Sequence, residues 1–125
     1  MRRVVDSSGW LEYLQGTERA DLFQPALEGT EAVLVPGITV YEVHRLIASK
    51  QGDHAADVAV GRMRRQTFIP LDAEIGVAAS RLSRQHRLAA ADAIIYASAQ
   101  IHEAELWTQD AHFQGLPDVN YFPKP

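Results

Sequence analysis

The sequence contains no cysteine, which excludes disulfide bridges, thiolate zinc sites and thiol nucleophiles. It has no run of 18 or more apolar residues, so we expect no membrane span. Its first residues do not resemble a signal peptide, because an acid follows too early. These absences favour a protein of the reducing cytoplasm. Acidic residues outnumber basic ones by 16 to 12, and the net charge of −4 argues against binding nucleic acid by overall charge alone.

Short apolar runs alternate with helical patterns along the 125 residues, a length that suits one domain spanning residues 1–125. We predict strands at residues 3–6, 32–36, 66–70, 105–108 and 119–122. We predict helices at residues 8–14, 20–28, 39–50, 53–65, from 72 past 82, and 88–100. This alternation predicts an α/β fold, in which helices cover both faces of a parallel sheet. Sites in such sheets lie at the carboxyl ends of the strands.

The stretch at residues 88–100 is rich in alanine and apolar on nearly every side, which predicts a buried helix packed closely against the sheet. Asp92 stands out in it, because it is an acid at the start of a buried helix. A carboxylate that is removed from water needs a partner. The positive end of the helix dipole is one such partner, and a bound cation is another.

Asp92 is one of four acids that the predicted fold brings toward a single edge of the sheet. Asp6 ends the first strand, Glu42 lies in the first turn of the helix after the second strand, and Asp110 follows the fourth strand by two residues. In a parallel sheet, the carboxyl ends of the strands share one edge with the helix starts that follow them. Asp92 joins the other three only if the loop before its helix returns to that edge, which we assume.

Each acid taken alone has a purely structural explanation, because acids at helix starts are common caps. Asp6 and Asp110 would close turns, Asp92 would lie in a first helical turn, and Thr39-x-x-Glu42 would form a capping box. Taken together, four carboxylates at one edge repel each other unless they are neutralised. Oxygen ligands without histidine or cysteine suit Mg²⁺ or Mn²⁺, and such acidic clusters hold ions that act on phosphate esters.

Four motifs resemble, in order and spacing, the acidic motifs of the PIN-domain nucleases, most closely those of the VapC-type toxins. They are residues 4–12 (VVDSSGWLE), 39–43 (TVYEV), 91–97 (ADAIIYA) and 106–113 (LWTQDAHF). The similarity extends from Val4 to about Tyr121. It implies a three-layer α/β/α sandwich with a short, mostly parallel sheet. It also implies a Mg²⁺- or Mn²⁺-dependent endoribonuclease, usually a homodimer, inhibited by a small, separately encoded antitoxin whose tail fills the active site.

The resemblance also implies roles for individual residues. The metal ion would be bound directly by Asp6, Asp92 and Asp110. Glu42 would ligate a metal or hold its water. Ser7 and Thr108 match positions where the family often has small hydroxyl residues near the metal. The metal would lower the pKa of its bound water, so hydrolysis would need no histidine base and would leave 5′-phosphate and 3′-hydroxyl ends.

The remaining polar residues carry weaker signals. The five histidines show no zinc spacing, so we interpret them as surface or structural residues, although His112 lies two residues after Asp110. Arginines at positions 62, 64 and 65 and at 81, 84 and 87 would contact RNA phosphates or form solvated helix faces.

Two other functions stay open. A PIN-like module could bind RNA or a partner protein without cleaving, but a decaying site usually loses one of its acids. A flavodoxin- or receiver-like binding domain would use a similar sheet. The sequence has neither the Gly-rich phosphate loop nor the paired acids that such domains use, so we rank this function last.

Overall fold

The computed structural model describes residues 1–125 and contains one sheet of five parallel strands in the order β3-β2-β1-β4-β5. The strands are β1 (Arg3–Val5), β2 (Val33–Pro36), β3 (Thr67–Ile69), β4 (Glu105–Thr108) and β5 (Val119–Tyr121). The helices are α1 (Ser7–Gln15), α2 (Ala20–Leu27), α3 (Gly37–Gln51), α4 (Asp53–Met63), α5 (Ala73–His86) and α6 (Ala90–Ile101), with the 3₁₀ helix η1 (Ala111–Phe113). The predicted α/β fold with its parallel sheet is confirmed.

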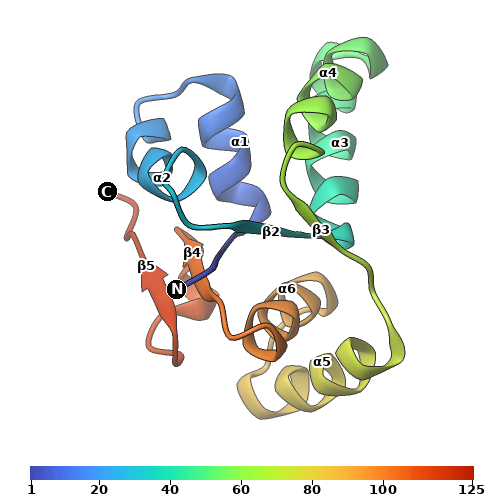
Figure 1. The fold of residues 1–125 in the computed structure, drawn as a ribbon, viewed down its shortest axis with the longest axis vertical. Helices are drawn as coiled ribbons and strands as arrows, with labels where there is room; N and C mark the ends of the chain where they lie inside the picture. The colour runs from blue at the N-terminus through green and yellow to red at the C-terminus, as the bar shows by residue number, and fades with distance from the viewer.

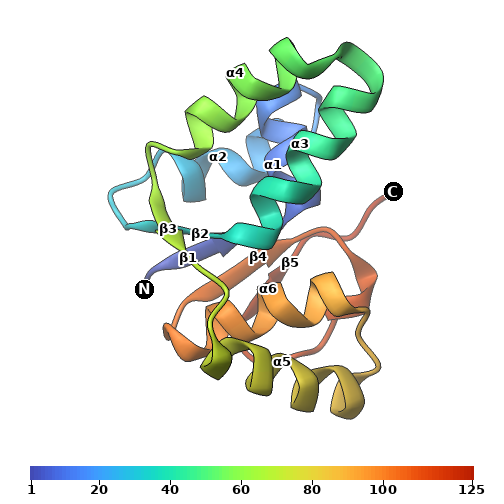
Figure 2. The same cartoon turned by 90° about the vertical axis from the view of Figure 1, so that its right-hand side faces the viewer.

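Helices cover both faces of the sheet, so the predicted three-layer sandwich is also confirmed. Helices α1 to α4 lie on one face, and α5 and α6 lie on the other (Figures 1 and 2). Successive strand residues point to opposite faces. Val4 and Leu106 therefore belong to the core beneath α5 and α6, whereas Val5 and Trp107 belong to the core beneath α1 to α4. Every helix falls short of the length and hydrophobicity that a membrane span needs.

The connection from β1 to α1 is tight, and a glycine makes it possible. A Cβ atom on Gly9 would lie 2.6 Å from Val5 Cγ1 and 2.7 Å from the Phe23 ring. Glycine thus lets α1 start at Ser7, directly after Asp6, and pack against α2. The residue that follows β1 is held in place at the carboxyl edge of the sheet.

Two predicted helix starts are wrong. We expected the first helix to begin at residue 8, but it begins at Ser7, and Asp6 is its N-cap and accepts a hydrogen bond from the Gly9 amide. We expected a helix from Thr39, with a capping box to Glu42, but α3 begins at Gly37. Thr39 therefore lies inside the helix, fully buried, and its Oγ1 has no hydrogen-bond partner. Glu42 lies in the second turn, so it cannot reach back to a cap.

Candidate metal centre

Asp6 is the most firmly held of the four predicted site residues. It is only 4 % exposed. Its carboxylate accepts hydrogen bonds from the Gly9 amide at 3.0 Å, from the Ser8 hydroxyl at 2.9 and 3.0 Å, and from the Thr108 hydroxyl at 2.6 Å. The structural interpretation of Asp6 as a cap is thus confirmed. Four donor contacts also fix the direction of this carboxylate, as a binding site requires.

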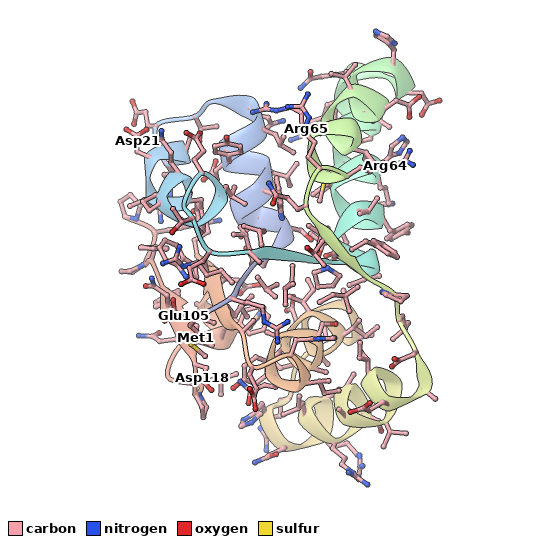
Figure 3. The ribbon with its side chains drawn as sticks, in the orientation of Figure 1. Met1, Asp21, Arg64, Arg65, Glu105 and Asp118 are labelled. Carbon is pink, nitrogen blue, oxygen red and sulfur yellow. The ribbon has the colours of Figure 1, made fainter.

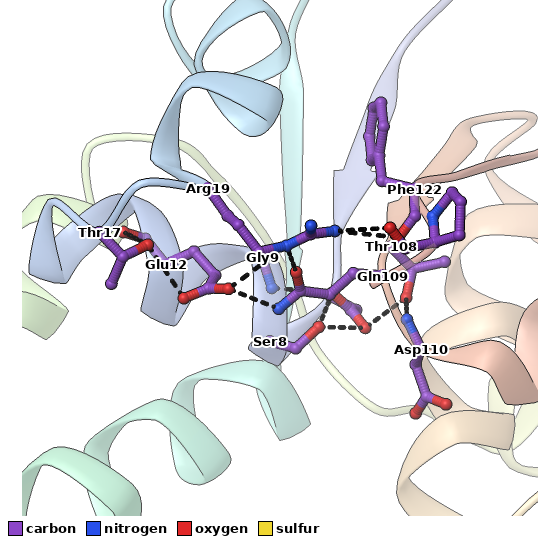
Figure 4. A network of polar contacts seen from close by, with 11 residues as sticks. Ser8, Gly9, Glu12, Thr17, Arg19, Thr108, Gln109, Asp110 and Phe122 are labelled. Atoms are coloured by element: carbon purple, nitrogen blue, oxygen red, sulfur yellow. Dashed lines mark hydrogen bonds and ion pairs between the residues drawn. The ribbon is translucent and has the colours of Figure 1, made fainter. Parts of the chain in front are cut away.

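Thr108, the last residue of β4, connects two of the site acids. Its hydroxyl donates to Asp6 Oδ2 and accepts from the Asp110 amide at 2.9 Å (Figure 4). The amide can only donate, so the single hydroxyl proton goes to the carboxylate. The ends of β1 and β4 are in this way fixed relative to each other.

Glu42 is held by the other hydroxyl that the family resemblance singled out. The Ser7 hydroxyl donates to Glu42 Oε1 at 2.5 Å. This contact joins the first turn of α1 to the second turn of α3. Ser7 and Thr108 each donate to a site acid, so their predicted proximity to the site is seen in the structure.

Asp92 differs from the other acids because no protein group donates a hydrogen bond to it. It lies in the first turn of α6, with its side chain 20 % exposed. Asp110 is 31 % exposed and caps η1 by accepting from the His112 amide at 2.9 Å. The His112 ring nitrogen Nδ1 lies 3.0 Å from Asp110 Oδ1 and 3.7 Å from Asp92 Oδ2. Asp110 therefore has a structural role, whereas Asp92 has none beyond its place near the helix start.

All four acids line one pocket of about 210 Å³ at the carboxyl edge of the sheet. We call them the acidic cluster: Asp6, Glu42, Asp92 and Asp110. The loop before α6 thus returns to the edge, as we assumed. A larger pocket of about 530 Å³ lies elsewhere, among Val35, Val40, Val60, Met63, Arg64 and Phe68. Its lining is almost wholly apolar and contains no acid. The smaller pocket, which the four acids line, is therefore the candidate site for a metal ion.

The charge of the acidic cluster is not balanced by any lysine or arginine, since no ion pair in the structure joins such a residue to it. Burial raises the pKa of Asp6 to about 6, against the opposing hydrogen bonds from Thr108, Gly9 and Ser8. Burial also raises the pKa of Asp92 to about 6, with further contributions from the charges of Asp110 and Glu42. Carboxyl groups in this state favour a nearby positive charge.

A second polar group, which the sequence did not reveal, lies beside the acidic cluster. We call it the balanced network: Glu12, Arg19 and Gln109. The Arg19 Nε donates to Gln109 Oε1 at 2.5 Å, Gln109 Nε2 donates to Glu12 Oε2 at 3.0 Å, and Arg19 also donates to the Phe122 carbonyl at 3.1 Å (Figure 4). Gln109 is only 4 % exposed and lies between Thr108 and Asp110. The network thereby holds the chain segment that carries Asp110.

The two groups of arginines that we considered for RNA contacts lie at different places. Arg64 and Arg65 are at the end of α4, where the chain enters β3 (Figure 3). This is the amino end of the parallel strands, opposite to the acidic cluster. Arg84 and Arg87 lie at the end of α5, just before the loop that leads to Asp92. Only this second group is at the same end of the sheet as the pocket.

The donor atoms of the pocket fit a hard divalent cation. Four carboxylates converge there from the starts of α1 and α6, from α3 and from the segment after β4. Mg²⁺ and Mn²⁺ prefer such oxygen ligands. Three groups, Asp92, Asp110 and His112, also offer ligand atoms that all lie within 4.8 Å of one another. The assignment of the four acids as metal ligands stays a prediction, which their shared pocket and uncompensated charge support.

Comparisons with known proteins agree with this architecture. The family model for the PIN domain matches residues 3–119. No curated protein matches the chain in sequence. Among solved structures, a toxin–antitoxin complex from Klebsiella pneumoniae is similar to this chain, with 24 % identity and a TM-score of 0.78. The similarity covers 94 % of this chain and 95 % of that one.

Two further solved structures show the same likeness. One is VapC20 from Mycobacterium tuberculosis, described as a toxin that cleaves the sarcin-ricin loop. It has 17 % identity and a TM-score of 0.78, with 94 % of this chain and 96 % of that one covered. The other is FitAcB from Neisseria gonorrhoeae, with 23 % identity, a TM-score of 0.69 and 96 % of each chain covered. At such identities the likeness establishes a shared fold, and activity requires separate evidence.

Proposed function

Because this chain belongs to the PIN-domain family, we propose that it is a metal-dependent endoribonuclease that hydrolyses RNA phosphodiester bonds, and that it is the toxin of a toxin–antitoxin pair. The observation that carries the proposal is the acidic cluster. Four carboxylates from four parts of the chain line one pocket, and no lysine or arginine pairs with them. Helix caps accept hydrogen bonds from backbone amides, but no protein group donates to Asp92, so capping does not account for the whole cluster.

Each residue of the acidic cluster would have its own role in holding the metal ion or its bound water. Asp6, Asp92 and Asp110 would hold Mg²⁺ or Mn²⁺. Glu42, aimed by the Ser7 hydroxyl, would hold the ion or its water. A bound divalent ion would activate water and stabilise the charge that develops on the phosphate. We expect products with 5′-phosphate and 3′-hydroxyl ends.

RNA as the substrate is supported by the family resemblance of the four motifs and by the similar toxin VapC20, which is described as cleaving the sarcin-ricin loop. Since the net charge is −4, attraction between the whole protein and RNA is weak, and local contacts have to supply it. Arg84 and Arg87 are suited to bind phosphates near the cut, because they lie at the same end of the sheet as Asp92.

The partners follow from the same comparison. The similar structure from Klebsiella pneumoniae is a toxin–antitoxin complex, so we propose a small antitoxin, encoded separately, as the protein partner of this chain. We also propose that the chain forms a homodimer and acts in the cytoplasm, where its RNA substrate would be found.

Cleavage of an end-labelled structured RNA by the purified protein tests this function. We expect cleavage with Mg²⁺ or Mn²⁺ and none with EDTA. Asp92→Asn, which removes a charge and keeps the side-chain shape, should lower the rate by about 100-fold or more. The matched control is Asp21→Asn, an exposed acid on α2 (Figure 3) that does not line the pocket and should leave the rate unchanged.

Three outcomes would count against the proposal. Activity that survives Asp92→Asn would come from a contaminating nuclease. Activity that survives EDTA would exclude the metal-dependent mechanism. Absence of both cleavage and divalent-ion binding would favour the non-catalytic module, with the four acids serving as structural groups only.

A further inference from the structure

We propose that His112 is a metal ligand of this site and that its imidazole makes the site prefer Mn²⁺ over Mg²⁺. The inference rests on the proposed function, since it adds a nitrogen donor to the site for which we propose carboxylates alone. Zinc-type spacing did not select His112, although it lies two residues after Asp110.

The backbone around His112 fixes where its ring can lie. η1 is anchored on one side by Asp110, whose carboxylate accepts from the His112 amide at 2.9 Å. On the other side Phe113 is fully buried and packs against Tyr96, with ring centroids 6.1 Å apart. Residue 112 is thus held between two fixed neighbours, and its side chain, 73 % exposed, reaches the carboxylate of Asp110, which lines the pocket.

One of two short distances matches that between adjacent ligand atoms on one ion, and the other is longer by less than 1 Å. His112 Nδ1 is 3.0 Å from Asp110 Oδ1 and 3.7 Å from Asp92 Oδ2. In an octahedral shell with bonds of about 2.1 Å, adjacent ligand atoms are about 3 Å apart. One oxygen from each acid and this nitrogen all lie within 4.8 Å of one another. The three groups are therefore already close to the arrangement that a shared ion would impose.

The other four histidines have no comparable surroundings. His44 of α3 pairs with Asp57 of α4 at 2.8 Å in an exposed contact, and His86 packs edge-on against Tyr96. His54 and His102 belong to no group of potential metal ligands. Only His112 faces two carboxylates of the acidic cluster.

The chemical consequence is a change in metal preference. Mg²⁺ is a hard cation that prefers oxygen ligands and gives up its water reluctantly. Imidazole suits transition metals better than it suits Mg²⁺, and Mn²⁺ is a transition-metal ion that also accepts carboxylate oxygens. A site with Asp92, Asp110 and His112 should therefore bind Mn²⁺ more tightly than Mg²⁺. Removing the imidazole should weaken Mn²⁺ binding by about 10-fold and Mg²⁺ binding by less.

Electron spin-echo spectroscopy of the Mn²⁺-loaded full-length protein tests this inference without any substrate. A directly coordinated imidazole gives a ¹⁴N modulation. We expect this signal in the wild-type protein, its loss in His112→Asn, and its retention in His44→Asn. The control is matched, because His44 also contacts a carboxylate but lies away from the pocket. Calorimetric titration with each ion should show the ratio of Mn²⁺ to Mg²⁺ affinity falling in His112→Asn alone.

The outcomes separate the two proposals. Bound Mn²⁺ without ¹⁴N modulation in the wild-type protein would overturn the ligand role of His112 and leave the carboxylate site intact. An unchanged affinity ratio in His112→Asn would overturn the proposed preference. If Mn²⁺ does not bind, or if Asp92→Asn and Asp110→Asn do not weaken its binding, the proposed metal centre itself fails.

Discussion

The acidic cluster and the balanced network meet at the carboxyl end of β4, and they differ in how their charge is compensated. In the balanced network Arg19 lies 3.7 Å from the Glu12 carboxylate and donates to Gln109, and every polar group there has a partner within the chain. In the acidic cluster Asp92 has no donor at all and His112 is the only basic neighbour. The balanced network is thus neutralised by groups of the chain itself, whereas the acidic cluster needs a positive charge that the chain does not supply.

The comparison shows which feature of an acidic group indicates function. Carboxylates occur in both groups, so their presence decides nothing. The missing counter-charge is the feature that indicates a binding site, because a buried carboxylate without a partner destabilises the fold unless a ligand compensates for its charge. Replacing one carboxylate by its amide in each group should therefore have different consequences.

The largest expected effect is stabilisation by metal that depends on the acidic cluster alone. Free Mn²⁺ at 100 times its dissociation constant should raise the free energy of unfolding by about 2.7 kcal/mol. Asp92→Asn should abolish most of this increment at the same ion concentration, whereas Glu12→Gln should retain it. Thermal unfolding with and without Mn²⁺ measures both. Equal increments in the two variants would show that the ion binds elsewhere and that the two groups do not differ in this respect.

The next effect concerns the balanced network. Arg19→Met keeps most of the side-chain length but removes every hydrogen bond of the guanidinium. It leaves the buried Gln109 side-chain oxygen and the Phe122 carbonyl without the donor that each has in the wild type. We expect a loss of about 2 kcal/mol in the free energy of unfolding, measured by urea denaturation.

Arg84→Met is the control for Arg19→Met, because Arg84 is exposed on α5 and donates only one long hydrogen bond of 3.3 Å, to the Ser80 carbonyl. It should change stability by less than about 0.5 kcal/mol. If Arg19→Met changes the free energy of unfolding as little as Arg84→Met does, the balanced network contributes little to stability. The two polar groups would then not differ in the way we describe.

The layers of the fold and the convergence of the four acids at one edge of the sheet were predictable from the sequence. Both follow from the periodicity of the apolar residues and from the alternation of strands and helices along the chain. Five apolar runs between helical patterns suffice for a parallel sheet, and such a sheet gathers strand ends at one edge. The order of the strands across the sheet, with β1 between β2 and β4, is set by the crossovers and packing of distant segments. The periodic pattern carries no information about it.

The sequence failed where a local pattern had two possible readings. Thr39 and Glu42 have the spacing of a capping box, but Pro36 and Gly37 start α3 earlier, because proline ends β2 in a conformation that precedes a helix. Gln109 and Arg19 are 90 positions apart, so nothing local indicates that they touch. His112 lacks the sequence spacing of a zinc ligand, and we therefore interpret it from the sequence as a surface or structural residue. Such spacing carries no information about a group of ligands that comes from separate segments of the chain.

The smallest expected effect is also the most direct test of the charge imbalance. Asp92→Asn should stabilise the metal-free protein at pH 7 by about 1 kcal/mol, since it removes a charge that burial and the neighbouring acids disfavour. The pKa of Asp92 is about 6 in the fold and 3.8 as its ordinary value. Between these values the folded protein binds more protons than the unfolded one. Stability of the wild type therefore falls as the pH rises through this window, and Asp6 contributes in the same direction.

It follows that the advantage of Asp92→Asn should shrink as the pH is lowered from 7 to 4, where Asp92 is protonated in the fold. Urea denaturation in the presence of a chelator, at pH 4, 5, 6 and 7, measures this. Glu12→Gln should show the opposite sign at pH 7, a small loss, because it removes the partner of Arg19. If both amide variants destabilise the metal-free protein alike, the acidic cluster is compensated within the chain, and the imbalance on which the metal proposal rests does not exist.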